Sequence, residues 1–255
     1  MLRKLIKYDL ISMGRTMVPL WVLTIITSIF MGIYLRFQAL HSGKINPDRF
    51  GFIMFMLALI ILFVVIMVLN VVEIIQRFWN GLLKEEGYLM YTIPVSTRKL
   101  ILSKVISGVL ITIGSVITAC IVAFMYFSLQ WVGPIDFENI SINLLPEAVI
   151  DTIILLFDGM AAIYFAYAAM AIGQLSTRSR LFCSFGAYIG LHIVQTLILT
   201  AGAFVVATFF PFFRGLIKYI PDSMLLIAPL IAIIVEIIIL HAITEYLLTN
   251  KLNLE

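Results

Sequence analysis

Charged residues are scarce in this chain of 255 residues, because Asp, Glu, Lys and Arg together make up only 12% of it. A soluble domain carries about 25% charged residues, so this sequence lacks the polar groups to cover a globular surface on all sides. Hydrophobic residues make up 62% of the chain, and its mean hydropathy is +1.11. These values exclude a water-soluble globular protein and predict an integral membrane protein.

Strong net charge and cysteine pairs are also missing. The net charge is +3, and the 17 basic residues are dispersed along the chain, which does not suit a nucleic-acid partner. The two cysteines, Cys120 and Cys183, lie in apolar stretches at what should be different depths. We therefore interpret them as small packing residues rather than as a disulfide.

Motifs for catalysis or metal binding are absent from the sequence. It contains no H-E-x-x-H, no G-x-S-x-G and no phosphate-binding G-x-x-x-x-G-K-[ST]. The three histidines, His41, His192 and His241, are scattered. We expect no catalytic residue and no metal site in this chain. Intramembrane hydrolysis through two acids from different spans remains an unfavoured alternative.

Long apolar runs are what the sequence does contain. About 20 apolar residues cross a bilayer core of about 30 Å as a helix, and six segments reach this length. The sequence therefore predicts an all-α membrane protein, with residues 1–255 forming a single transmembrane domain. The expected spans are residues 17–39, 50–75, 101–130, 149–175, 181–205 and 223–247.

The fifth apolar run is too long for one crossing. Leu181–Phe213 contains no charged residue, and as a straight helix it would extend about 50 Å. Pro211 interrupts the helical pattern near its far end. We expect the crossing to end near Val205 and residues 207–221 to form a short outer re-entrant hairpin. A single long, tilted helix is the alternative.

The distribution of Lys and Arg predicts the orientation. With the N-terminus in the cytoplasm, twelve of the 17 basic residues are cytoplasmic. The five outside are Arg36, Lys44, Arg49, Arg214 and Lys218. By the positive-inside rule, both termini of this multi-pass membrane protein are then cytoplasmic.

The first 15 residues have the pattern of a basic amphipathic helix. Leu2, Leu5, Ile6 and Met13 recur at helical spacing, with basic residues around them. Such a helix can lie along the inner membrane surface before the first span. Anchoring by positive charge alone is a compatible reading.

Acidic residues inside the predicted spans are costly in a membrane and need an explanation. Asp151 and Asp158 continue an acidic stripe that starts at Glu147, at spacings of four and seven residues. The stripe suits either a water-filled translocation path or pairing with outer basic residues such as Arg36 or Lys218. The sequence leaves these two roles open.

Three further acids lie near or within the spans. Glu236 follows Pro229 by seven residues, and a kink at that proline is expected. Glu245 lies four residues after His241, so a local pair is expected there. Glu73 ends the second run and can pair with Arg77, four residues later.

Small residues predict where helices approach closely. Gly186 and Gly190 form a G-x-x-x-G in the fifth run. Similar small-residue spacings occur at Ser115, Ala119 and Ala123, and again at Ala169 and Gly173. This pattern predicts a tightly packed bundle and is compatible with a dimer.

The connection between the second and third runs, residues 76–99, carries more apolar side chains than a polar loop needs. Pro94 ends a helical pattern within it, and Ser96 suits the N-cap of the next helix. Apolar residues such as Tyr88 and Leu89 would be exposed there unless something covers them. They suit either a helix that fits a partner's groove or an interfacial anchor with tyrosines, and local chemistry favours the anchor.

Three stretches distributed over the whole chain carry a family resemblance: KLIKYDLISMGR, EEGYLMYTIPVSTRKLILSK and LTNKLNLE. With them the chain resembles the membrane subunit of a type-2 ABC (ATP-binding-cassette) transporter, of the short six-span kind common in Gram-positive bacteria. The central stretch is the most specific. The resemblance implies an amphipathic N-terminal helix and a re-entrant hairpin between spans 5 and 6. For residues 76–99 it implies a coupling segment that contacts an ATPase, instead of the interfacial anchor that local chemistry favours.

The resemblance also implies residues and partners. The coupling residues would be Glu85, Glu86, Gly87, Tyr88, Leu89, Met90 and Tyr91. Two copies of a separate ATPase subunit would bind ATP and Mg²⁺, because this chain has no nucleotide-binding motif and needs no cofactor of its own. A second copy of this chain, or a similar permease, would complete the path, surrounded by membrane lipid.

The expected function is therefore that of an ABC transporter permease, a non-catalytic translocase subunit of an exporter. Its candidate path residues are Asp151, Asp158 and Glu236. The alternative is an ion- or proton-coupled secondary transporter that uses Asp158 and Glu236.

Overall fold

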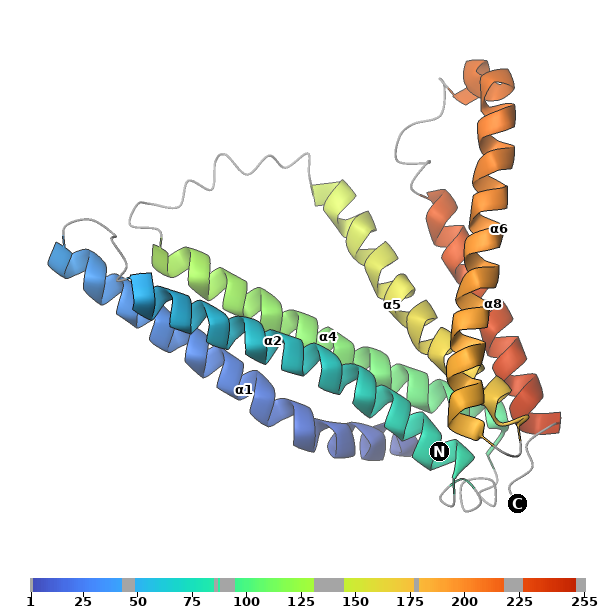
Figure 1. The fold of residues 1–255 in the computed structure, drawn as a ribbon, viewed down its shortest axis with the longest axis horizontal. Coiled ribbons are helices and arrows are strands. Elements are labelled where there is room, and N and C mark those ends of the chain that lie inside the picture. The colour runs from blue at the N-terminus through green and yellow to red at the C-terminus, as the bar shows by residue number, and fades with distance from the viewer. Residues whose placement is uncertain are drawn as a thin grey trace. The chain divides into compact units, whose positions relative to one another are not determined.

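A computed structural model describes most of the chain, and its regular structure is entirely helical (Figure 1). The described residues are 2–42, 49–84, 87, 95–130, 145–176, 179–217 and 227–250. Their helices are α1 (Leu2–Ser42), α2 (Arg49–Phe78), the π-helix η1 (Trp79–Leu83), α4 (Thr97–Gln130), α5 (Leu145–Gly173), α6 (Arg180–Ile217) and α8 (Ile227–Asn250). No strand occurs among these residues, which confirms the predicted all-α class.

Six of these helices are long and apolar enough to cross a membrane. Their apolar segments are Leu2–Tyr34, Ile53–Leu83, Thr97–Met125, Ile150–Gly173, Arg180–Val206 and Pro229–Asn250. The six predicted runs are therefore confirmed as helices of spanning length. Element boundaries differ most at the N-terminus, where the helix starts at Leu2 rather than near residue 17.

The basic N-terminal segment forms the first turns of α1, with no break before the apolar part of the helix. Pro19 lies inside α1, and its missing N–H removes the bond to the carbonyl of Arg15. Figure 1 shows the dark-blue N-terminal turns running in a different direction from the rest of α1, as a proline kink would produce. The basic segment therefore bends into the apolar part of the same helix, and its position along the membrane surface stays a prediction.

The predicted interruption of the fifth span at Pro211 is absent from the structure. α6 continues from Arg180 through Pro211 to Ile217, which agrees with the alternative of one long helix. A proline removes one helical hydrogen bond, and membrane helices tolerate this loss where local adjustment satisfies the freed carbonyl. The rest of the expected hairpin, residues 218–221, lies outside the described residues.

Two other prolines lie close to the first described residue of a helix. Pro146 is the second described residue of α5 (Leu145–Gly173), and Pro229 is the third of α8 (Ile227–Asn250). The residues before both helices lie outside the described ones, so the kink expected at Pro229 stays a prediction.

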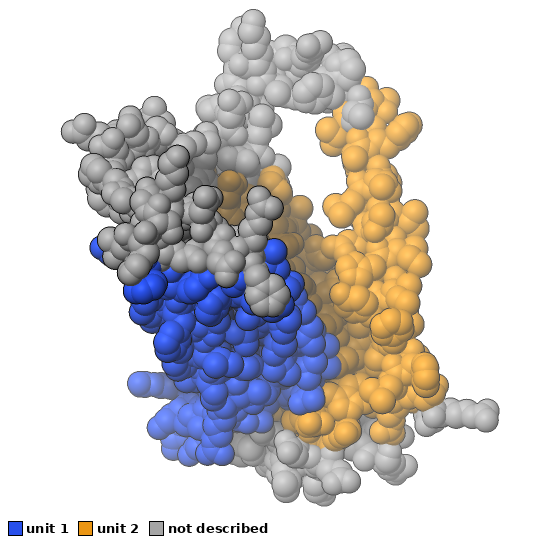
Figure 2. All heavy atoms as spheres, turned by 60° about the vertical axis from the view of Figure 1, so that its left-hand side comes forward, with its two compact units in different colours: residues 1–77, 106–140 blue, residues 78–105, 141–255 orange. Residues whose placement is uncertain are grey.

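The chain divides into two compact units (Figure 2). Unit 1 contains residues 1–77 and 106–140, and unit 2 contains residues 78–105 and 141–255. Within unit 1, α1, α2 and α4 run alongside one another (Figure 1). The buried face of α1 carries Met13, Met17, Thr24, Ser28 and Met31, a spacing of three, four and seven residues that places them on one side of the helix.

The core of unit 2 lies where α5 packs against α6 and α8. Residues 163–165 and 167–171 of α5 are buried, and so are Leu240, Thr244 and Leu248 of α8. The first turns of α4 contribute Leu100, Ile101 and Val105. Figure 1 shows α5 and α6 closest near the short connection between them and diverging toward their other ends.

Candidate functional site

The connection between α2 and α4 begins with a change of helix type. The last turn of α2 passes into the π-helix Trp79–Leu83, whose Gly81, Leu82 and Leu83 are buried. Lys84 then takes an extended conformation, with φ −107° and ψ −164°. Short π-helical turns are rare and are often found at functional positions. The chain therefore leaves the membrane helix at a defined place.

Gly87 is the one predicted coupling residue that the structure describes. Its N–H donates to the carbonyl of Lys84 at 2.8 Å, which turns the chain back toward the π-helix. A Cβ at Gly87 would lie 2.6 Å from the carbonyl oxygen of Leu82, so no larger residue fits without a backbone shift. The other six predicted coupling residues, Glu85, Glu86, Tyr88, Leu89, Met90 and Tyr91, lie outside the described residues.

Both ends of this connection are fixed within unit 2. At its start, the ring of Phe78 stacks on Tyr167 of α5, with centroids 4.0 Å apart and both side chains buried. At its end, the carbonyl of Ser96 accepts hydrogen bonds from the N–H groups of Lys99 and Leu100. α4 thus starts after Ser96, which confirms the predicted N-cap position.

Arg98 in the first turn of α4 reaches α8. Its Nε donates to Oε1 of Glu245 at 2.5 Å. Glu245 also lies 3.9 Å from Nε2 of His241, so the predicted local pair on α8 is confirmed. The His241 ring in turn meets Tyr164 of α5 edge to face, with centroids 5.4 Å apart. A chain of contacts therefore runs from the end of the connection into α8 and α5.

An ion pair in unit 1 joins the N-terminal part of α1 to the C-terminal end of α2. It was not predicted from the sequence. Nε of Arg77 donates to Oδ1 of Asp9 at 2.8 Å, and the Asp9 side chain is only 4% exposed. The sequence suggested Glu73 as the partner of Arg77, but Arg77 pairs with Asp9 of α1. An acid inside an otherwise basic N-terminal stretch was the available signal.

Of the three predicted path residues, Glu236 has a defined partner. Nε2 of Gln195 on α6 donates to its Oε1 at 2.7 Å. Both side chains are half-buried and lie within apolar spanning segments. The sequence reasoning did not use Gln195, although a carboxamide in the middle of an apolar run was a signal for an interhelical hydrogen bond.

Asp151 and Asp158 are exposed in the N-terminal half of α5. Among the described residues, neither takes part in an ion pair. Phe165 of α5 contacts the ring of His192, with centroids 4.3 Å apart, and Gly173 lies against Ser184. In this antiparallel register, Asp158 lies opposite position 199 on α6, about one turn beyond Gln195. Asp158 and Glu236 are therefore at similar depths on different helices.

The predicted packing glycines behave differently from one another. A Cβ at Gly173 would lie 1.8 Å from Oγ and 2.6 Å from Cα of Ser184, so α5 and α6 approach closely at this point. By contrast, no described atom lies within 4 Å of a Cβ placed at Gly186 or Gly190. The G-x-x-x-G stripe therefore does not pack the helices within the described chain.

The spanning segments contain few side chains that could coordinate a metal ion. Among the described residues, no group of three His, Cys, Asp or Glu side chains is placed to hold a metal ion. The cysteines that the structure describes are both free, with Cys120 exposed and Cys183 half-buried. The polar contacts found here hold helices together and do not form a constellation for bond cleavage.

The fold and these contacts fit a multi-pass membrane protein with six spanning helices. Compared with protein-family models, curated proteins and solved structures, the chain gives no match. The function must therefore be argued from the residues and the geometry of the chain itself.

Proposed function

We propose that this protein is the permease subunit of an ABC exporter. The carrying observation is the stretch 85–104, EEGYLMYTIPVSTRKLILSK, which resembles the coupling region of type-2 ABC permeases and directly follows the π-helix at the end of α2. Six apolar helices of spanning length support this assignment. In this proposal both termini and the connection 76–99 are cytoplasmic, in a bacterial cell membrane.

The ATPase would be a separate subunit in two copies, with ATP and Mg²⁺ bound there. A dimer of this chain, or a pair with a similar permease, would form the path. Glu85 to Tyr91 would contact the ATPase. The contacts at both ends of the connection, Phe78 with Tyr167 and Arg98 with Glu245, would transmit its displacement to α5 and α8.

Two structural details belong to the same proposal. The exposed Arg3, Lys4, Lys7 and Arg15 of α1 would hold its first turns at the cytoplasmic membrane surface. A re-entrant piece between the fifth and sixth spans would be formed by residues 207–221, which include the last turns of α6. Labelling of single cysteines placed at 3, 84 and 222 with a membrane-impermeant maleimide tests this topology, because only residue 222 should react from outside; Lys84 is exposed, so a cysteine fits there.

A specific contact supports a second candidate, a proton- or ion-coupled carrier. Glu236 lies within a spanning segment and accepts a hydrogen bond from Gln195, and ionisable residues at such positions often belong to ion pathways. In that case transport would follow an ion gradient and would need no ATPase.

Co-purification with measurement of ATP hydrolysis separates the two candidates. The chain, isolated in mild detergent from its native membranes, should retain an ATPase subunit and hydrolyse ATP. Tyr88→Asp and Leu89→Asp should release that subunit. Tyr246→Asp provides the matched control, because Tyr246 is an exposed tyrosine near the end of α8. Retention of the ATPase by all three variants, or transport that runs on an ion gradient without any ATPase, would refute the ABC proposal.

A further inference from the structure

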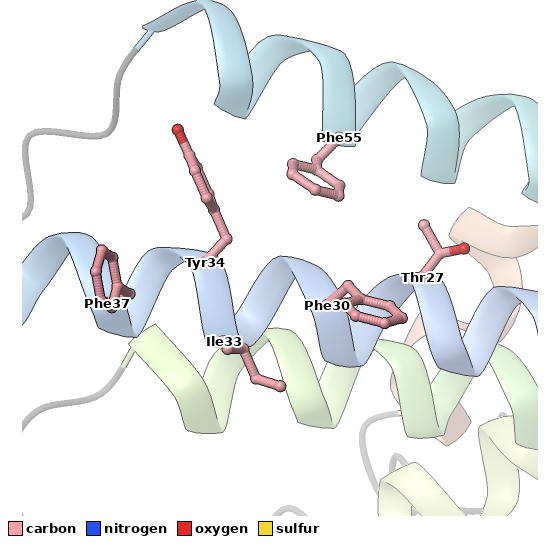
Figure 3. A pocket seen from close by; sticks show the side chains of 6 residues that line it. All are labelled: Thr27, Phe30, Ile33, Tyr34, Phe37 and Phe55. Atoms are coloured by element: carbon pink, nitrogen blue, oxygen red, sulfur yellow. The ribbon is translucent and has the colours of Figure 1, made fainter.

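A groove of about 500 Å³ lies between α1 and α2 in unit 1 (Figure 3). Its lining residues are Thr27, Phe30, Ile33, Tyr34, Phe37 and Phe55. The volume falls in the range of small-ligand sites. The lining is aromatic and aliphatic, apart from the hydroxyl groups of Thr27 and Tyr34. The Thr27 hydroxyl donates to the carbonyl of Leu23 at 2.8 Å, so its hydrogen needs no acceptor on a bound molecule.

The groove is held in shape by contacts between the two helices. Figure 3 shows the rings of Tyr34 and Phe55 facing one another, and their centroids are 5.5 Å apart. The Tyr34 hydroxyl lies 2.4 Å from the place that a Cβ at Gly51 would occupy. Tyr34 can therefore lie close to α2 only because residue 51 is glycine. The wall of the groove is thus fixed by the fold.

The length and depth of the groove match one leaflet of a bilayer. Thr27 and Phe37 are ten residues apart on α1, which corresponds to about 15 Å of helix. A hydrocarbon core of about 30 Å gives each leaflet about the same 15 Å. The uncharged run of α1 ends directly before Arg36, and that of α2 starts directly after Arg49. The groove therefore begins at the headgroup level near the α1–α2 connection and extends toward the bilayer centre.

Charge at the headgroup end is positive. Arg36 is exposed and is the first charged residue after the apolar run of α1. In the sequence between residues 16 and 72 the charged residues are Arg36, Lys44, Asp48 and Arg49, a net charge of +2. A guanidinium at this level complements a lipid phosphate.

We propose that this groove is a specific site for one acyl chain of an anionic phospholipid from the leaflet nearest the α1–α2 connection, with its phosphate at Arg36. The acyl chain lies along Phe30, Tyr34 and Phe55. This assignment does not depend on the ATPase or on the transported substrate. An occupied groove would fill the space between α1 and α2 and stabilise unit 1 in the membrane.

Native mass spectrometry of the purified full chain tests the site, with dioleoyl phosphatidylglycerol or dioleoyl phosphatidylcholine as the added lipid. One phosphatidylglycerol should bind about tenfold more tightly than any further lipid. Thr27→Phe places a ring in the groove and should weaken that first binding about tenfold, the equivalent of roughly two buried methylenes. Val22→Phe is the matched control, since Val22 is exposed on the same helix outside the groove.

The headgroup contact has its own variant. Arg36→Gln should reduce the preference for phosphatidylglycerol over phosphatidylcholine about fivefold, because a cation near the membrane surface contributes about 1 kcal/mol. Gly51→Ala displaces Tyr34 and should weaken binding of the first lipid without filling the groove. If Thr27→Phe does not fold, this variant tests the groove in its place. The proposal is overturned if no first lipid is distinguishable in the wild type. Equal binding by Thr27→Phe and Val22→Phe, or an unchanged lipid preference in Arg36→Gln, also overturns it.

Discussion

The Arg77 guanidinium donates to the Asp9 carboxylate at 2.8 Å and joins the N-terminal turns of α1 to the end of α2. The two side chains differ in burial, with 4% of Asp9 and 28% of Arg77 exposed. A shielded pair of this kind gains more from its hydrogen bond than a fully exposed pair. It also fixes α2 directly before the π-helix that starts the connection between α2 and α4.

Removal of the Asp9 carboxylate should therefore destabilise the protein. We expect Asp9→Asn to lower the free energy of unfolding by about 1–3 kcal/mol, because Arg77 keeps a partly buried charge without its partner. Unfolding in detergent, followed by circular dichroism, measures this change. Glu73→Gln is the control and should leave stability within about 0.5 kcal/mol. A loss in Glu73→Gln as large as that in Asp9→Asn would contradict the special importance of the Asp9 pair.

Gly173 should be sensitive to any side chain. A Cβ there would lie 2.6 Å from both N and Cα of Ser184, so α5 and α6 must move apart. Gly173→Ala should cost about 1–3 kcal/mol of stability, as overpacking does elsewhere. Gly190→Ala should instead be neutral or stabilising by up to about 1 kcal/mol, since its surroundings are open and alanine favours helix. Thermal unfolding of both variants checks the contrast.

A polar network holds the three helices of unit 1 together. Trp21 Nε1 and Asn70 Nδ2 both donate to Oγ of Ser115, at 3.1 and 3.2 Å. Trp21→Phe should cost about 0.5–1.5 kcal/mol, because it removes one of these interhelical bonds in a membrane segment. Gly114→Ala should disturb the same place, since a Cβ would lie 2.4 Å from the Trp21 ring.

Tryptophan fluorescence reports on that network. The chain contains three tryptophans, Trp21, Trp79 and Trp131. In a variant that keeps only Trp21, the emission maximum should shift when Gly114→Ala is added. Gly159→Ala, where no described atom lies within 4 Å of the added Cβ, should leave the spectrum unchanged. An identical spectrum in both variants would contradict the close contact of Trp21 with α4.

The bond between Gln195 and Glu236 should couple α6 to α8. Gln195→Leu should lower stability by about 1–2 kcal/mol, because it leaves a carboxylate in an apolar segment without its donor. In Gln195→Leu/Glu236→Leu most of this loss should be recovered. A double-mutant cycle from unfolding curves measures the coupling, and simple additivity of the two single changes would argue against a direct bond.

Asp158 should matter for transport rather than for stability. It is exposed, so Asp158→Asn should change the free energy of unfolding by no more than about 0.5 kcal/mol. If it lines the path, the same variant should alter transport in reconstituted vesicles while the assembly stays intact. Loss of the folded complex would instead assign Asp158 a structural role.

Apolar runs predicted the helices well, and local pairing rules predicted the contacts unevenly. Glu245 with His241 was correct, because residues four apart on a helix must be neighbours. The same rule failed for Glu73 and Arg77, since Asp9 on another helix offers a more buried partner. The proline rule failed at Pro211, because α6 continues through that residue to Ile217.

By itself, the sequence determined that this chain is a membrane protein of six long helices, because hydrophobicity and segment length are properties of each stretch alone. Only the tertiary structure decided which side chains meet. Gln195 reaches Glu236, Arg77 reaches Asp9, and Gly51 makes room for Tyr34. These contacts depend on the register and approach of helices far apart in the chain, which no local pattern specifies.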